Sequence, residues 1–278
     1  MKKSMLIMTL LVLCLLTVTA CGHPKILGVK SLVAANASAQ SKVKNYHMDG
    51  TVNMDIALDS EVLADLPLDP KLPVNMTLAA DAGTNTAHVM TEAGVSLFDQ
   101  SVVLQTTEIY MDMENQVAYT KAGDSQEWEK VDDQKEQEEQ KEQLGLKELV
   151  GGIASVGKTV LENTTFEESD EFYTLTMPAE KAGDLIADLN LLDSVDVGIA
   201  DVRDITVEGG QIIYNVDKET LLVSSIQLND VDVRGTGVYE ETSVDLKFPI
   251  NADFQFSRYD ELEEAEYAIP EEVKGTEE

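Results

Sequence analysis

The sequence holds very few of the side chains on which covalent catalysis and metal binding depend. Its 278 residues include two cysteines, Cys14 and Cys21, and three histidines, His23, His47 and His88. The patterns G-x-S-x-G, H-E-x-x-H and C-x-x-C do not occur. We therefore expect a protein that is not an enzyme and that needs no metal or other cofactor.

Basic residues are also scarce. The chain has 20 Lys and Arg residues against 52 Asp and Glu residues, for a net charge of −32. A charge of this sign and size repels phosphate backbones, so we expect no nucleic-acid partner. The acidic residues predict a soluble, well-hydrated exterior.

The first 25 residues, MKKSMLIMTLLVLCLLTVTACGHPK, are typical of an export signal. Lys2 and Lys3 precede the apolar run Met5–Leu16, which is too short to span a bilayer as a permanent helix. We predict a signal peptide over residues 1–20. Its removal leaves 18 basic residues against 52 acidic ones, or a net charge of −34.

The end of this segment, Val18-Thr19-Ala20-Cys21, resembles the lipobox of bacterial lipoproteins. The resemblance implies that Cys21 is acylated, that residues 21–24 form an anchor and spacer, and that the protein lies on the extracytoplasmic face of the cell membrane. The alternative is an ordinary signal peptide that contains a cysteine. In either case the mature chain keeps only Cys21, so no internal disulfide can form.

Most of the remaining sequence alternates between apolar and polar residues. In YHMDGTVNMDIAL, the even positions from Tyr46 to Leu58 are mostly apolar and the odd positions mostly polar. This period of two predicts a long strand with one dry face, and clean alternation favours antiparallel pairing. Further strands are predicted at 74–80, 85–92, 100–111, 116–121, 171–177, 211–217, 221–229, 242–249 and 252–258, with a hairpin turn at Asp217–Thr220.

Helical spacing is confined to residues 25–44, 144–162 and 177–191. The fold class is therefore α+β, with one large antiparallel sheet and a few helices against one face. We predict a single domain over residues 25–272, with an exposed acidic segment at 127–143 and a disordered tail at 273–278.

Residues Gly152–Thr159 match the phosphate-binding pattern G-x-x-x-x-G-K-[ST]. However, Leu149, Ile153, Val156 and Val160 recur at helical spacing straight through the match, and no βαβ context accompanies it. We interpret 144–162 as an amphipathic helix that does not bind a nucleotide. Whether it is a fixed or a movable lid stays open.

Residues 230–241 partly match a calcium-binding loop, with Asp230, Asp232, Gly235 and Glu241 at pattern positions. Arg234 stands where a ligand oxygen is required, and the flanking sequence alternates like a strand. We therefore favour a polar hairpin turn here over a weak calcium site.

Methionines recur on the predicted dry strand faces, at Met48, Met54 and Met76, with Met90, Met111 and Met177 as further candidates. Flexible thioethers suit a surface that adapts to varied apolar ligands. The alternative is that these side chains only fill the core.

The order of segments resembles the Gram-positive surface lipoproteins related to the LolA and LprG/LppX carriers. The resemblance rests on the lipobox followed by KNYHMDGTVNMDIAL, IYMDMENQVAYTKAGDSQEWEKVD, FYTLTMPAEKAGDLI and IIYNVDKETLLVSSIQL. It implies a curved, unclosed half-barrel whose concave face is covered by helices and holds acyl chains. The candidate ligand-binding residues are then Met48, Val52, Met54, Ile56, Met76, Leu78, Leu149 and Ile153.

Two functions follow from these expectations. The first is a monomeric, membrane-anchored protein that binds or carries a lipid or another hydrophobic molecule between sheet and helices. The second is a non-catalytic cell-surface interaction or sensing module whose core is fully self-packed.

Overall fold

A computed structural model of the chain describes residues 25–59, 71–97, 100–115, 117–123, 125, 127–131, 162–183, 199–239 and 242–275. Its strands are β1 (Asn45–Asp59), β2 (Lys71–Gly83), β3 (Thr86–Leu97), β4 (Gln100–Asp112), β5 (Val117–Ala122), β6 (Glu129–Val131), β7 (Thr165–Glu168), β8 (Phe172–Pro178), β9 (Ile199–Asp217), β10 (Val223–Tyr239) and β11 (Thr242–Ser257). Its helical segments are α2 (Val29–Gln40), the 3₁₀ turn η1 (Ala179–Lys181), α7 (Glu264–Tyr267) and α8 (Glu271–Lys274).

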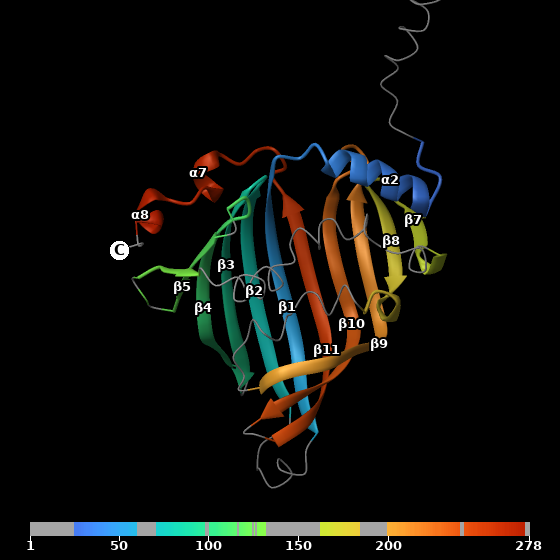
Figure 1. The fold of residues 1–278 in the computed structure, drawn as a ribbon. Helices are drawn as coiled ribbons and strands as arrows, with labels where there is room; N and C mark the ends of the chain where they lie inside the picture. Colours follow the sequence, from blue (N-terminus) through green and yellow to red (C-terminus); the bar gives the residue numbers. More distant parts are fainter. Residues whose placement is uncertain are drawn as a thin grey trace, which may run out of the picture.

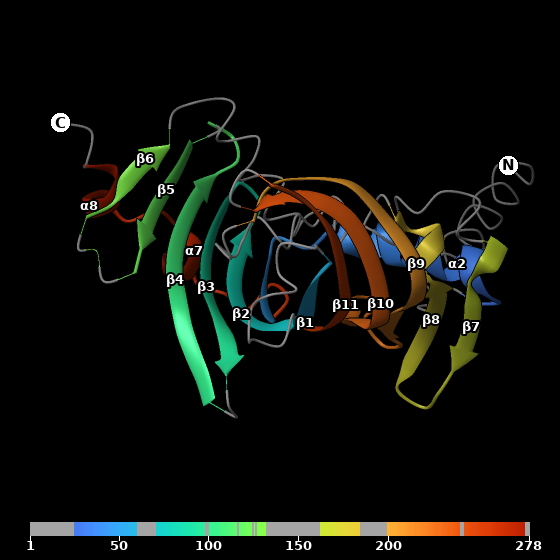
Figure 2. The same ribbon diagram turned by 90° about the horizontal axis from the view of Figure 1, so that it is seen from below.

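The strands form one 11-stranded sheet in the order β6-β5-β4-β3-β2-β1-β11-β10-β9-β8-β7. Each neighbouring pair is antiparallel. The first strand therefore pairs with the last, with Met48 opposite Phe256 and Val52 opposite Ala252. The sheet curves strongly, and its edges β6 and β7 lie far apart (Figures 1 and 2). The predicted α+β class with an open, curved antiparallel sheet is confirmed.

The alternation predicted for the first strand is also confirmed. Met48, Val52, Met54 and Ile56 are each at most 2% exposed, whereas Thr51 between them is exposed. Successive side chains of a strand point to opposite faces, so this pattern places every second residue of β1 in the core.

Strands β9 and β10 are longer than the sequence predicts. Bulges interrupt the register between them, and each strand continues beyond its bulge. The register between β9 and β10 shifts near Asp230, which has a φ of 47°, and Gly210 of β9 has a φ of 94°. The predicted polar turn at 230–241 is therefore wrong over 230–239, which is the second half of β10. Residues predicted as two strands at 242–258 form the single strand β11, whose pairing with β1 keeps one register on both sides of Pro249.

The hairpin between β9 and β10 is confirmed at the predicted position. The side chain of Asp217 accepts hydrogen bonds from the backbone N–H groups of Glu219 and Thr220, at 3.1 and 2.7 Å. A short acceptor side chain at this position satisfies turn donors that have no strand partner.

Helix α2 lies across one end of the sheet (Figure 1), within the predicted range 25–44. Leu32 is fully buried in the core, and the Asn36 side chain donates a 2.8 Å hydrogen bond to the carbonyl of Leu221 beside the β9–β10 turn. This bond joins the helix to a strand hairpin 185 residues away in sequence.

The other helical predictions are only partly described. Of 177–191, the structure describes the turn η1 and residues up to Gly183, and the predicted helix at 144–162 lies almost wholly outside the described residues. Beyond residue 272, Val273 of α8 is 1% exposed and packs with Tyr119 and Ile269.

Candidate functional site

The predicted ligand-binding residues that the structure describes lie on one apolar face of the sheet. Met48, Val52, Met54 and Ile56 of β1 and Met76 of β2 are at most 4% exposed, and Leu78 is partly buried against the same core. Leu149, Ile153 and the predicted lipidation site Cys21 lie outside the described residues. The apolar face continues across the sheet through Val89, Ile109, Phe254, Ile226, Ile212 and Leu175.

The other candidate methionines divide between the two faces. Met177 is buried in the core and Met111 packs against it, but Met90 is 53% exposed. Met90 pairs with Ala79 and Glu108, so it belongs to the row that faces away from the core. The expectation that Met90 lies on the dry face is therefore wrong.

Tyr214 of β9 places a polar atom in the apolar face. The side chain is fully buried, and its hydroxyl has no hydrogen-bond partner among the described residues. Leu175 of β8 and Ile226 of β10 flank it in register. Burial raises the pKa of the Tyr214 hydroxyl well above its usual range, so it stays protonated and able to donate.

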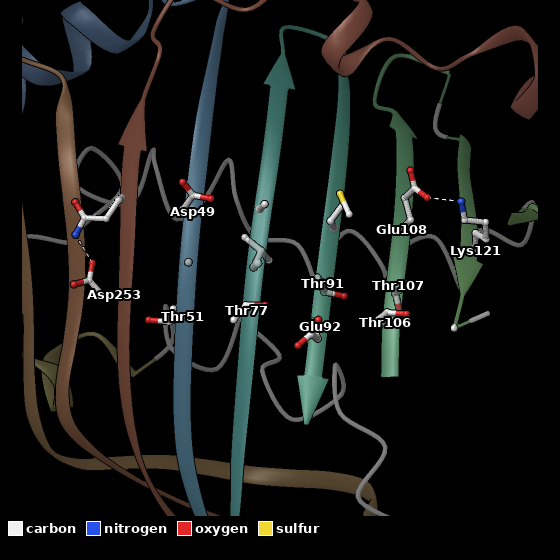
Figure 3. Close-up of a pocket in the computed structure, with 16 residues that line it drawn as sticks. Asp49, Thr51, Thr77, Thr91, Glu92, Thr106, Thr107, Glu108, Lys121 and Asp253 are labelled. Carbon is white, nitrogen blue, oxygen red and sulfur yellow. Dashed lines mark hydrogen bonds and ion pairs between the residues drawn. The ribbon is translucent and has the colours of Figure 1, made fainter. Parts of the chain in front are cut away.

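A hollow of about 750 Å³ lies on the opposite, polar face of the sheet (Figure 3). Asp49 and Thr51 of β1 line it, and they alternate with the buried residues Met48 and Val52. Its other lining residues come from β2, β3, β4, β5 and β11, and those in the outward-facing rows include Thr77, Met90, Glu92, Thr106, Glu108, Lys121, Asp253 and Gln255.

Charge is unevenly spread over this hollow. Four carboxylates, from Asp49, Glu92, Glu108 and Asp253, face one cation, Lys121. Lys121 forms an ion pair with Glu108 at one side of the hollow, while Asp49 and Asp253 lie toward the other side (Figure 3). The arrangement offers hydroxyl and carboxylate oxygens to a polar partner.

Glu108 is held by two partners. Nε2 of His88 lies 3.0 Å from Oε1 of Glu108, and the ammonium of Lys121 contacts Oε2. Burial alone would raise the pKa of Glu108, but these two hydrogen bonds and the nearby positive charge outweigh it and lower that pKa. The His88 ring also stacks on Tyr110, with centroids 4.3 Å apart, and Lys121 lies over the ring of Trp128.

His47 bridges two carboxylates beside the hollow. Its Nδ1 lies 2.7 Å from Oδ1 of Asp81, and its Nε2 lies 3.0 Å from Oδ2 of Asp49. Burial alone would lower the pKa of His47, but the two hydrogen bonds and the negative charges raise it. The prediction placed His47 on the wet face, where it lies; the sequence did not indicate that two carboxylates would meet it there.

Neither the phosphate-binding pattern nor the calcium-binding pattern corresponds to a ligand site among the described residues. The phosphate-binding pattern at 152–159 lies outside the described residues. Asp230, Asp232 and Gly235 of the calcium pattern follow the extended path of β10, and no group of three His, Cys, Asp or Glu residues in the described part of the chain could hold a metal ion. The described helices also include none that is long and apolar enough to cross a membrane.

Sequence comparison relates the chain to proteins whose function has not been assigned. No curated protein matches it. Among solved structures, the chain is similar to a DUF1329 family protein from Desulfovibrio piger ATCC 29098, with 8% identity and a TM-score of 0.24 over 86% of this chain and 96% of that one. The profile described as "Family of unknown function (DUF6612)" matches residues 28–278. The chain therefore belongs to the DUF6612 family.

Proposed function

We propose that this protein is a lipid-anchored, extracytoplasmic binding protein that holds a lipid or another hydrophobic molecule against the apolar face of its sheet. The lipobox-like end of the signal segment supports the anchor at Cys21. The protein binds without catalysing a reaction, acts as a monomer, and uses no nucleotide, nucleic acid or cofactor.

The methionine-rich apolar face carries this proposal. Met48 and Met54 lie on β1 and Met76 on the adjacent strand β2, where Met76 is the cross-strand partner of Val52, two residues before Met54. Thioether side chains change rotamer at little cost and contact apolar groups of varied shape. The face also carries the small buried residues Ala80 and Ala93 between larger apolar neighbours.

The Tyr214 hydroxyl, which has no hydrogen-bond partner among the described residues, supports an amphiphile over a pure hydrocarbon. A buried hydroxyl without a partner costs about 1–3 kcal/mol, and a ligand oxygen that accepts its hydrogen bond removes that cost. The proposed ligand therefore carries an apolar chain and at least one acceptor oxygen, such as an acyl carbonyl.

Native mass spectrometry of the chain from Gly22 onward, expressed in a bacterial host, tests ligand binding. We expect added mass that organic extraction removes, and uptake of a fluorescent fatty acid by the extracted protein. Tyr214→Phe should weaken uptake, whereas Tyr259→Phe should not, because the Tyr259 hydroxyl already donates to the carbonyl of Val223. Protein that carries no ligand and takes up none would refute the proposal.

The anchor has a separate test. In fractionated cells, Cys21→Ala should move the protein from the membrane to the soluble fraction. Retention of the variant on the membrane would contradict acylation at Cys21.

The polar hollow favours the second candidate function, an interaction or sensing module. Its threonine-rich floor lies on the face opposite the proposed lipid site, so the two functions can be separated by substitution. Thr77→Trp fills the hollow from the middle strand β2 and should abolish binding of a cross-linked protein partner while leaving fatty-acid uptake intact. If Thr77→Trp keeps partner binding and loses fatty-acid uptake, the hollow is not the partner site.

A further inference from the structure

We propose that the outer side of helix α2 is a docking surface for an anionic lipid bilayer. The proposal rests on the proposed anchor at Cys21, and it adds a second contact with the membrane. It starts from an asymmetry in the chain: all 52 acidic residues lie at or after Asp49, and none precedes it.

The basic residues of this acid-free segment are exposed. Lys25 precedes α2 by four residues, Lys30 lies in its first turn, and Lys42 and Lys44 follow its end. None of the four forms an ion pair with another described residue. These four lysines form a local positive surface on a protein whose net charge is −32.

An apolar side chain lies within the same surface. Leu27 is 75% exposed, the highest value among the exposed large apolar residues of the described chain. Its backbone N–H is held by the Ser31 hydroxyl at 2.8 Å, which fixes the residue at the start of the helix. An exposed Leu between two lysines is the arrangement with which interfacial helices enter the headgroup region of a bilayer.

The position of the anchor brings this surface to the membrane. Only residues 22–24 separate the proposed acylated cysteine from Lys25, and the four steps along the chain from Cys21 to Lys25 span at most about 14 Å. This limit is less than two screening lengths of about 8 Å at physiological ionic strength, so the lysines at the start of α2 are attracted to anionic headgroups. The chain enters α2 at one end of the sheet, so docking there sets the strands upright on the membrane (Figure 1).

Acidic groups at the same end limit how the domain can tilt. Glu219 is exposed in the β9–β10 turn, whose Leu221 carbonyl accepts a hydrogen bond from Asn36 in the second half of α2, and the exposed Asp260 accepts one from the backbone N–H of Lys44 after the end of the helix. The attraction is therefore strongest when the start of α2, with Lys25, Leu27 and Lys30, lies nearest the bilayer.

A fluorescent label on the lipidated protein tests the contact. The mature chain has only Cys21, whose thiol is acylated, so Ala34→Cys supplies a unique labelling site on the exposed side of α2 for an environment-sensitive dye. The protein is placed in vesicles of phosphatidylcholine alone, or of phosphatidylcholine and phosphatidylglycerol at 7:3. We expect a blue-shifted emission only in the anionic vesicles, with loss of the shift in 1 M salt.

Matched variants separate this contact from general charge effects. Lys25→Gln with Lys30→Gln should abolish the shift, and Leu27→Ser should reduce it. Lys181→Gln with Lys247→Gln removes the same charge from exposed sites elsewhere and should leave the shift unchanged. A label at Leu104→Cys, on β4, should report the same aqueous environment in both vesicles.

The outcomes distinguish this proposal from the proposed anchor. If the protein does not float with vesicles of either composition, the anchor fails, and co-sedimentation of the unacylated chain with anionic vesicles at low salt then tests α2 alone. Each lysine contributes about fivefold to such binding, so the Lys25→Gln and Lys30→Gln pair should weaken it about 25-fold. Equal emission in the two vesicle types, or an α2 double variant that behaves like its matched control, would overturn the docking surface.

Discussion

Replacing Tyr214 by phenylalanine should stabilise the ligand-free protein. The ring fills the same space in the core, and the substitution removes only a hydroxyl that has no partner among the described residues. Such a group costs about 1–3 kcal/mol when buried, so we expect a gain of about 1–2 kcal/mol in the free energy of unfolding. For a domain of this size that gain raises Tm by about 2–4 °C for each kcal/mol.

Tyr259→Phe is the matched control for this prediction. The Tyr259 hydroxyl donates a 2.6 Å hydrogen bond to the carbonyl of Val223, and its loss leaves that carbonyl without the bond. We expect Tyr259→Phe to lower the free energy of unfolding by about 1–2 kcal/mol, the opposite sign.

Chemical denaturation of extracted and ligand-loaded protein measures both variants. If the Tyr214 hydroxyl donates to an acceptor oxygen of the ligand, Tyr214→Phe should be more stable than the unsubstituted protein only when both have been extracted. Added ligand should then raise the free energy of unfolding of the variant by less than it raises that of the unsubstituted protein. A loss of more than about 1 kcal/mol in extracted protein would refute the reasoning, because it would mean that the hydroxyl already has a partner.

Three further substitutions test other contacts. Gly210→Ala should lower the free energy of unfolding by about 2 kcal/mol or more, since φ is 94° and a Cβ would lie 2.5 Å from backbone atoms of β10, whereas Gly183→Ala meets only ordinary contacts and should be near neutral in urea denaturation. Because the folded-state pKa of His47 is raised, its contribution to the free energy of unfolding is fully present below about pH 6.5 and is lost as pH rises through the folded pKa. His47→Gln should flatten that decline in stability. An unchanged pH profile would contradict the bridge from His47 to Asp49 and Asp81. The pKa of Glu108 is lowered, so its stabilisation is present above about pH 4.3 and is lost as pH falls through the folded pKa; Lys121→Met should raise that pKa in an NMR titration, and an unmoved pKa would show that the ion pair does not hold it down.

Local pattern was enough to predict the faces of the strands. The alternation around Met48 and Met54 placed both side chains in the core, and the acceptor side chain of Asp217 marked the β9–β10 turn correctly. Both features depend on residues within a few positions of one another, where the backbone period and turn chemistry act directly.

The prediction failed where distant segments decide the outcome. Residues 230–239 have the polar, glycine-containing composition of a turn, yet they continue β10 because β9 and β11 flank them on both sides. Met90 belongs to an otherwise alternating strand, and only its pairing with Ala79 and Glu108 shows which face it occupies. A short polar segment adopts the extended form when neighbouring strands satisfy its backbone hydrogen bonds.

By itself, the sequence determined the antiparallel class, the dry face of β1 and the charge of the exterior, because composition and a period of two specify these without reference to partners. Only the tertiary structure decided that β1 pairs with β11, which joins the two ends of the chain at the middle of the sheet. That pairing also brings β11 beside β1 to complete the polar hollow, and the pairing of β9 with β8 and β10 sets the Tyr214 hydroxyl among apolar neighbours. Strand order and cross-strand neighbours depend on contacts between residues far apart in sequence, and these contacts exist only once the chain has folded.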